Sequence, residues 1–320
     1  MSNSSHLKKD WTISAIIFTF LVGHSVIVNH DGWPPRATDP ALVAEVASRI
    51  RPPSWLPYNL TEKALPNYGQ AGQVQLILAL TRNKTGGFFI ETGAYDGEQM
   101  SNTLLLERSL GWRGLLIEPS RTLFPRLMTK HRRSWALHAC CSQTGAPFQA
   151  IFRDQVDSGF SSVEDGLSAQ KQSDHIIHMK KGSREELLKY PVDCYPLYTI
   201  LLAMNRTTVD FFSLDVEGVE MGVLAYLPWH LLDIKIVLAE SYMGGMWNPQ
   251  ADQMRWFMAQ QGYMAFRVMH DWLFVKKDSE FAADAPEIVR NTREKMVAGG
   301  RLPGAIEDFY NGFNDLRVRR

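Results

Sequence analysis

The sequence predicts an α/β fold with a mostly parallel β-sheet that is covered by helices on both faces. Two observations lead to this prediction. Across residues 85–277, apolar runs of strand length alternate with runs of helical pattern. Three of the strand-like runs also end in an acidic residue, at Glu91, Glu118 and Asp215. Open α/β sheets bind their ligands at the carboxyl ends of the strands, which is where these acids stand.

The chain begins with a polar segment, residues 1–10, and an apolar run follows from Trp11 to Val28. The length of this run is near the lower limit for a transmembrane helix, which is about 17–25 residues. Lys8 and Lys9 precede the run, and only Arg36 follows it closely. The positive-inside rule therefore predicts a short cytosolic tail and a lumenal remainder.

This run is expected to be an uncleaved, single-pass type II signal anchor. The membrane would be one of the secretory pathway, in the endoplasmic reticulum, the Golgi apparatus or the endosome. A cleaved signal peptide is the alternative, because the small residues Gly23 and Ser25 suit a cleavage site. Three glycosylation acceptors lie beyond the run, at Asn59, Asn83 and Asn205, and they would carry glycans in the lumen.

A proline-rich stretch, residues 29–84, is expected to form a lumenal stem. It contains seven prolines, so most of it should be extended or irregular. One short helix is predicted from Ala41 to Arg49, with Asp39 as its N-cap and Pro40 in its first turn. A second helix, Gln73–Arg82, should lead into the first strand.

The core, residues 85–277, should alternate strands with helices. The predicted strands are Phe88–Glu91, Gly114–Glu118, Trp135–Cys141, Val209–Asp215, Ile234–Ala239, Tyr263–Met269 and Trp272–Lys276. The predicted helices are Asn102–Leu110, Arg121–Lys130, Val219–Tyr226 and Gln250–Gln260. Gln155–Lys189 is predicted to be a polar insertion. A turn at His270-Asp271 should join the last two strands into an antiparallel hairpin, and residues 278–320 should form a helical tail.

The three cysteines do not form a disulfide framework. Neighbouring residues on a strand point to opposite faces, so Cys140 and Cys141 cannot both reach Cys194. A lumenal location permits one bridge. The cysteine spacing is also not that of a zinc site.

Charge and motifs narrow the class of protein. Lysine plus arginine equals aspartate plus glutamate, at 34 each, so the net charge is zero and does not indicate a nucleic-acid partner. An apolar content of 45% is typical of a globular protein with a real core. The sequence has neither a phosphate loop ending in Gly-Lys-Ser/Thr nor a Gly-x-Ser-x-Gly nucleophile elbow.

A ligand-binding turn is predicted at the end of the first core strand. The stretch Phe88–Gly97 reads FFIETGAYDG, with Gly93 and Gly97 after the apolar run. Glycine lets the backbone approach a ligand closely, and the N-terminus of the next helix directs free N–H groups at it. The next strand ends in Glu118, roughly 20 residues beyond the turn, where an acid binds ribose hydroxyls in open α/β sheets.

A third stretch, Val209–Glu220, reads VDFFSLDVEGVE. Its apolar strand delivers Asp215, Glu217 and Glu220 around Gly218. A buried strand without a function would rarely end in so many acids, because unpaired buried carboxylates are costly. The alternative is a solvated loop before a helix N-terminus, where acids are also favourable.

Together the three stretches resemble the FkbM family of S-adenosylmethionine-dependent methyltransferases. The hallmark of that family is an apolar strand followed by D-x-E-G-x-E, as in FFSLDVEGVEMGVL. The resemblance covers residues 85–277. At GAYDGEQMSNTLLLERSLGWRGLLIEPS it is closest to a membrane-anchored animal branch that includes the trafficking protein Star. It implies a Rossmann-like class I methyltransferase fold with S-adenosylmethionine as the cofactor.

The resemblance also implies roles for single residues, with Glu118 as the ribose-binding acid. The residues expected to bind the cofactor are Glu91, Gly93, Tyr95, Asp96, Gly97, Asn102, Glu118 and Asp215. The sequence departs from the family at Tyr95, where asparagine is usual, and at Ser213, where lysine is common. These departures bear on catalysis more than on the existence of the pocket.

The expected reaction is in-line transfer of a methyl group to a hydroxyl oxygen of an acceptor. Asp215 is the first candidate for the base that takes the hydroxyl proton, and Glu217 and His270 are further candidates. The acids could instead hold a divalent cation that polarises the hydroxyl, although the sequence displays no full ligand set. The alternative function is non-catalytic: a Star-like protein that assists the trafficking of secretory cargo, with the fold as a binding module.

Overall fold

The structure is a computed structural model that describes residues 37–61, 69, 72–155, 161–164, 187–243, 246–247, 251–268 and 271–298. Its helices are α1 (Pro40–Arg49), α2 (Gln73–Leu80), α3 (Leu104–Leu110), α4 (Leu123–Thr129), α6 (Leu197–Ala203), α7 (Glu220–Ala225), α8 (Ala251–Gln260) and α9 (Ala285–Ala298). The strands that build the central sheet are β1 (Phe88–Thr92), β2 (Arg113–Ile117), β3 (Trp135–Leu137), β8 (Thr208–Leu214), β9 (Asp233–Glu240), β12 (Tyr263–Val268) and β13 (Asp271–Lys276).

The central sheet has seven strands in the order β12-β13-β9-β8-β1-β2-β3. The strands from β9 to β3 are parallel, and β13 and β12 are antiparallel to their neighbours. The predicted parallel sheet with a C-terminal antiparallel hairpin is therefore confirmed. The strand order reverses between β1 and β8, which lie side by side although far apart in the chain. Sheets of this kind bind ligands at such a switch point.

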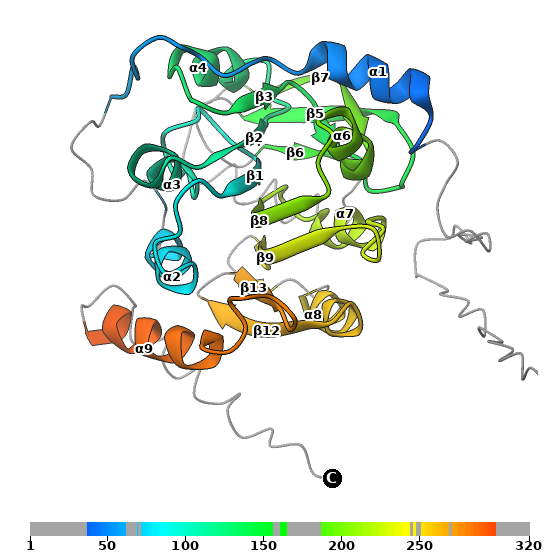
Figure 1. Cartoon of the computed structure of the whole chain (residues 1–320). Coiled ribbons are helices and arrows are strands. Elements are labelled where there is room, and N and C mark those ends of the chain that lie inside the picture. The colour runs from blue at the N-terminus through cyan, green and yellow to red at the C-terminus, as the bar shows by residue number, and fades with distance from the viewer. Residues whose placement is uncertain are drawn as a thin grey trace, which may run out of the picture.

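Helices cover both faces of the sheet, as Figure 1 shows. One apolar core lies between the sheet and α1, α6, α7 and α8, and includes Ile90, Val237 and Leu224. The other lies between the sheet and α2, α3, α4 and α9, and includes Phe89 and Leu106. Neighbouring residues of a strand point to opposite faces, so Phe89 and Ile90 belong to different cores.

Ala37, the first described residue, already belongs to the packed body, although it lies within the range that we expected to form a stem. Ala37 is fully buried, and its carbonyl accepts a hydrogen bond from Thr199 Oγ1 at 2.6 Å. Helix α1 is capped as predicted, because Asp39 Oδ1 accepts the Ala41 N–H at 2.9 Å. After α1 the chain forms a β-bridge between Arg51 and Ala136 at the β3 edge.

Two predictions about the middle of the chain were wrong. The run Trp135–Cys141 is not one strand, because β3 ends at Leu137 and β4 (Cys140–Cys141) joins a second sheet. The expected polar insertion, Gln155–Lys189, contains β6 (Ser162–Val163) and the start of β7 (Leu187–Tyr195), and β5 (Phe148–Gln155) ends at its first residue. These strands complete the second sheet in the order β4-β7-β5-β6. Continuous apolar character does not reveal where a chain changes sheets, and charged side chains on one strand face resemble a loop.

The second sheet pairs two of the three cysteines. Cys140 and Cys194 are register partners on β4 and β7 and form a disulfide, with 4.4 Å between their Cα atoms. Cys141 is a free, buried thiol in the apolar core. The structure thus pairs only one of the two adjacent cysteines with Cys194, as the strand geometry requires.

Within the described residues, no helix is long and apolar enough to cross a membrane. The predicted anchor, residues 11–28, lies outside those residues, as does the tail beyond α9.

Candidate active site

Acidic side chains gather where the parallel strands of the central sheet end. Glu91 belongs to β1, Glu118 directly follows β2, and Asp215 directly follows β8. Two more acids complete the row, since Glu240 ends β9 and its register partner Asp271 begins β13. The sheet topology therefore brings all of these acids to one edge, next to the switch point between β1 and β8.

Gly93 lies where the turn after β1 meets the turn after β8. Its φ is +73°, and a Cβ at this position would lie 2.0 Å from the Asp215 carbonyl oxygen. The two turns are also joined by a hydrogen bond of 3.3 Å from Asp215 N to Thr92 O. Only glycine combines this backbone angle with so close an approach, so Gly93 sets the position of Asp215 relative to β1.

Glu91 and Asp96 organise the loop after β1. Glu91 is buried and accepts hydrogen bonds from Ser101 Oγ, Thr103 Oγ1 and Asn102 N, at 2.9, 2.6 and 2.6 Å. Burial raises the pKa of Glu91, although these bonds and the charge of Arg132 oppose the shift. Asp96 Oδ1 accepts the backbone N–H groups of Glu98 and Gln99 at 2.8 and 2.7 Å. The structure therefore gives both residues a supporting role in the predicted cofactor turn.

Asn102 offers an unused acceptor at the switch point. Its backbone N–H is held by Glu91, and its Nδ2 donates to Ser213 Oγ at 3.1 Å. Its Oδ1 is buried and has no hydrogen-bond partner among the residues that the structure describes. A buried acceptor without a partner costs free energy, so Oδ1 is suited to a donor group of a ligand.

Glu118 is buried at 4% exposure and fixes the same turn from the other side. Its Oε2 accepts the Tyr95 N–H and its Oε1 accepts the Ser120 N–H, both at 2.8 Å. Burial raises the pKa of Glu118 to about 8, against the effect of these two hydrogen bonds. Each carboxylate oxygen still has a second lone pair, which leaves Glu118 able to accept ligand hydroxyls.

Tyr95 has a left-handed backbone, with φ of +53°. This conformation costs a residue other than glycine about 1–2 kcal/mol, and asparagine adopts it more readily than tyrosine. Glu217 has the same kind of backbone, with φ of +56°, in the turn after β8. Unfavourable backbone angles therefore occur on both sides of the row of acids, as is common at functional sites.

Three carboxylates form a close cluster on the β8 and β9 side. Oxygens of Asp215, Glu217 and Glu240 lie within 4.8 Å of one another. Burial raises the pKa of Asp215 to about 6, opposed by a hydrogen bond between the Asp215 and Glu240 side chains. Burial and neighbouring negative charges also raise the pKa values of Glu217 and Glu240 well above the ordinary range. The cluster therefore holds protons at pH values where isolated carboxyl groups are ionised.

Neighbouring acids support this cluster. Glu220 Oε1 accepts the Val216 and Gly218 N–H groups at 3.1 and 2.9 Å and so shapes the turn after β8. Asp271 Oδ2 accepts Gln73 Nε2 at 3.1 Å. Burial raises the pKa values of Glu220 and Asp271 to about 7.

The sequence prediction captured most of this site but not all of it. Asp215 and Glu217 are brought together as expected, and His270 lies outside the described residues. Glu240 was missed. The signal that pointed to Glu91 and Glu118, an apolar strand that ends in an acid, is also present in β9, which reads DIKIVLAE.

The three clustered carboxylates are also the donor set that hard divalent cations prefer, since such ions take oxygen ligands. Carboxylates can equally share protons when no cation is bound. The geometry alone is compatible with either use of the cluster.

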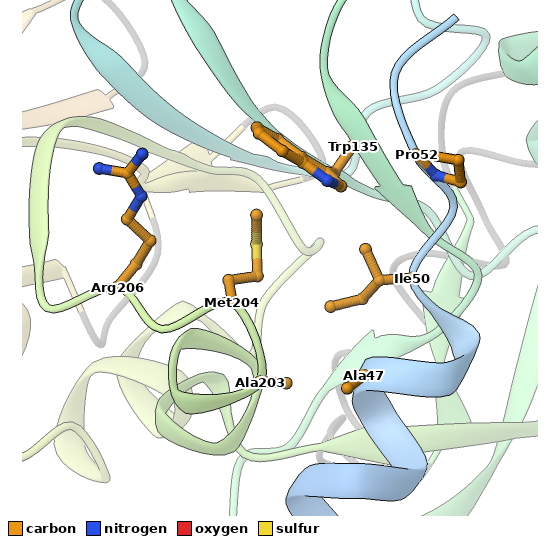
Figure 2. A pocket seen from close by; sticks show the side chains of 7 residues that line it. All are labelled: Ala47, Ile50, Pro52, Trp135, Ala203, Met204 and Arg206. Carbon is orange, nitrogen blue, oxygen red and sulfur yellow. The ribbon is translucent and has the colours of Figure 1, made fainter.

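A separate groove lies at the opposite end of the strands. It has a volume of about 350 Å³ and is lined by Ala47, Ile50, Pro52, Trp135, Ala203, Met204 and Arg206, as Figure 2 shows. Arg206 stacks over Phe88, with 4.6 Å from its Cζ to the ring centroid. The groove contains no carboxylate and lies at the start of β3 and β8, so it is distinct from the acidic edge.

Residues 91–264 match the Methyltransferase FkbM domain family. The chain belongs to this family. The matched range includes Glu91, the turn after β1, Glu118 and the Asp215, Glu217 and Glu240 cluster. The FkbM domain therefore carries the whole acidic edge apart from Asp271.

Three solved structures resemble the FkbM domain at low similarity. An RNA methyltransferase from Salinibacter ruber is 12% identical, with a TM-score of 0.29, and the match covers 67% of this chain and 96% of that one. S-adenosylmethionine-dependent methyltransferases from Geobacter sulfurreducens and Thiobacillus denitrificans are also 12% identical, with TM-scores of 0.29 and 0.28. The matches cover 75% and 81% of this chain, and 88% of each of those chains. All three were solved with S-adenosyl-L-homocysteine. No curated protein matches the sequence.

The geometry accounts for the asparagine that the FkbM family has at position 95 but not for the tyrosine of this chain, and it leaves the departure at Ser213 open to test. The family usually has asparagine at Tyr95, and the left-handed backbone there is one that asparagine tolerates. At Ser213 the family commonly has lysine. Here Ser213 Oγ is an acceptor for Asn102, and no described lysine or arginine forms an ion pair with the carboxylate cluster.

Proposed function

We propose that the chain is an S-adenosylmethionine-dependent O-methyltransferase, anchored in a membrane of the secretory pathway with its domain in the lumen. The observation that carries the catalytic part is the row of carboxylates at the switch point of an FkbM domain. The acceptor is a hydroxyl-bearing molecule of the lumen.

The residues at the acidic edge fit the cofactor chemically. S-adenosylmethionine carries a sulfonium and an ammonium, and the cluster offers carboxylates without a paired cation. Asn102 Oδ1 is a buried acceptor without a partner, suited to an ammonium donor. Glu118 would hold ribose hydroxyls, and Gly93 and Gly97 let the turn beside it pack closely against Asp215 and Leu127.

When bound, the cofactor supplies an electrophilic methyl group. The protein holds the acceptor hydroxyl against it, and such positioning can contribute roughly 7–11 kcal/mol to lowering the barrier. Asp215 takes the hydroxyl proton. With its pKa raised to about 6, Asp215 is ionised at neutral pH and still basic enough for this role. Glu240, hydrogen-bonded to Asp215, keeps the carboxylate oriented.

The Asp215→Asn variant tests this assignment. The change is nearly isosteric, so the fold and most of the cofactor affinity should be kept. Methyl transfer from labelled cofactor to a lumenal membrane fraction should fall by about 10²–10⁴-fold, as is usual when a general base is removed. Undiminished transfer would contradict the role of Asp215, whereas lost cofactor binding and lower stability together would indicate a structural role.

The membrane and lumenal part of the proposal has two supports. The apolar run 11–28 follows Lys8 and Lys9, and the Cys140–Cys194 disulfide suits an oxidising compartment. Glycans are proposed on Asn59, Asn83 and Asn205, which are exposed. The Asn59 Nδ2 donates one of its two hydrogens to the Thr129 carbonyl at 3.1 Å, which leaves the other free to be replaced by a glycan.

Glycosidase treatment of the chain expressed in cells tests this orientation. The mass should fall by three glycans, and Asn59→Gln, Asn83→Gln and Asn205→Gln should each remove one. Glycosidase resistance, together with protease access to the C-terminus in sealed microsomes, would reverse the topology.

A non-catalytic role in the trafficking of secretory cargo is the second candidate. It is favoured by Tyr95 and Ser213, which depart from the family pattern at the cofactor turn and beside the cluster. In that role Asp215→Asn would leave cargo export unchanged, and the wild type would methylate no lumenal fraction. Both results together would replace the enzyme proposal.

A further inference from the structure

Trp55 and Leu56 protrude from the surface of the domain. Trp55 is 86% exposed and Leu56 is 36% exposed, which makes them adjacent large apolar side chains in water. A single exposed apolar side chain is ordinary, but a tryptophan of this exposure next to a leucine indicates a surface that contacts something.

The segment that carries these side chains is held firmly at both ends. Before Trp55, Ser54 N donates to Arg132 O at 3.0 Å, and Ser54 O accepts from Arg133 Nη1. Ser54 Oγ also accepts the Leu56 N–H at 3.2 Å. After Leu56, the Pro57 carbonyl lies 2.9 Å from His131 Nδ1. The two apolar side chains therefore form a fixed protrusion, which we call the Trp55–Leu56 knob.

The knob lies on the edge of the sheet where the chain arrives from its N-terminus. Helix α1 and the segment after it run along the β3 end of the sheet, at the top of Figure 1, whereas α8 lies at the β12 end. The eight residues 29–36 separate the predicted anchor from Ala37. Eight residues extend at most about 29 Å, so the predicted anchor would hold Ala37, and with it this edge of the domain, near the membrane surface.

Two arginines lie near the knob, and within the described residues neither forms an ion pair with a carboxylate. Arg51, four residues before Trp55, is exposed. Arg133 is half-buried, donates to the Ser54 carbonyl and packs over Tyr58, with 4.9 Å from its Cζ to the ring centroid. An exposed guanidinium close in the chain to a tryptophan suits lipid phosphates at a membrane interface.

We propose that the Trp55–Leu56 knob inserts into the headgroup region of the membrane that anchors the chain. This inference rests on the proposed anchor at residues 11–28. Two side chains cannot bury the roughly 1,000 Å² that a stable protein interface needs. They suffice for a second membrane contact, because the anchor already holds the domain at high effective concentration near the lipid. The knob thereby fixes which edge of the domain faces the bilayer.

Fluorescence quenching by lipid tests the proposal on the full chain in phosphatidylcholine vesicles. Lipids brominated near the headgroup end of the acyl chains quench tryptophans that reach the interface. Trp55→Phe should remove part of the quenched fluorescence. The matched control Trp256→Phe, at a side chain 53% exposed on α8, should leave the quenched component unchanged. Both positions are exposed, so neither variant should lose its fold.

Three results would overturn the inference. If quenching is equal in the wild type and in Trp55→Phe while the chain still floats with the vesicles, the knob does not insert into the membrane, although the anchor does. Disulfide cross-linking of two copies through Leu56→Cys shows that a second copy covers the surface instead. A chain that does not float with the vesicles refutes the anchor and the knob together.

Discussion

Replacing Glu118 by glutamine tests whether this carboxylate binds the cofactor or only stabilises the fold. Glu118 accepts the Tyr95 and Ser120 N–H groups at 2.8 Å each. Glutamine keeps one acceptor oxygen and turns an NH₂ group toward the other N–H. One buried donor then lacks a partner, which should lower the free energy of unfolding by about 1–3 kcal/mol.

The same change should weaken the binding of S-adenosylmethionine. A hydrogen bond to a charged group contributes about 1.5–3 kcal/mol, so loss of one ribose contact should weaken binding at least about tenfold. The difference between wild type and Glu118→Gln should be larger at pH 8.5 than at pH 6.5. Burial raises the pKa of Glu118 to about 8, and the protonated side chain resembles glutamine.

Asp210→Asn is the matched control. Asp210 is also a buried carboxylate that accepts a backbone N–H, from Phe88 at 2.8 Å, together with Lys84 Nζ at 2.7 Å. It lies at the opposite end of the central strands. Calorimetry and denaturant titration should show similar losses of stability for both variants, but weaker cofactor binding only for Glu118→Gln. Equal affinities in the two variants would refute the assigned ribose-binding acid.

Further predictions concern pH, backbone strain and the disulfide. Burial raises the pKa values of Glu118 to about 8 and of Asp271 and Glu220 to about 7, above those of unfolded carboxyl groups near 4. Between about pH 8 and about pH 6 the folded state therefore binds protons that the unfolded chain does not bind. The melting temperature should rise as the pH falls from about 8 to about 6. The affinity for the cationic cofactor should fall over the same range. The Tyr95→Asn variant should raise the free energy of unfolding by about 1 kcal/mol, because asparagine tolerates the left-handed backbone at this position. A free energy of unfolding below that of the wild type, measured by denaturant titration, would show that the contacts of the tyrosine ring outweigh the backbone strain. The Cys140–Cys194 disulfide joins residues with a sequence separation of 54, so its reduction should lower the free energy of unfolding by roughly 4 kcal/mol. An unchanged denaturation midpoint after reduction would argue against the bridge.

The acidic edge was largely predictable because it depends on a local signal. A buried strand followed by an acid marks the end of the strand, and this signal placed Glu91, Glu118 and Asp215 at the carboxyl edge of the sheet, where the structure has them. Sequence could not assign their individual tasks. Glu91 is occupied by the 101–103 loop, and this follows from hydrogen bonds that only the folded chain displays.

The second sheet was not predictable in the same way. Strand β7 begins inside the predicted polar insertion, which ends at the charged Lys189, and no strand was predicted at β5, which carries charged residues such as Arg153. Their pairing joins residues far apart in the chain, as at Phe148 and Cys194. Contacts of this range depend on tertiary packing that overrides local pattern.

The most direct test of the account is titration of the full-length chain with S-adenosylmethionine by calorimetry at pH 8. We predict a single binding event that Glu118→Gln weakens at least about tenfold and that Asp210→Asn leaves unchanged. The absence of binding by the folded wild-type chain would contradict the proposed methyltransferase.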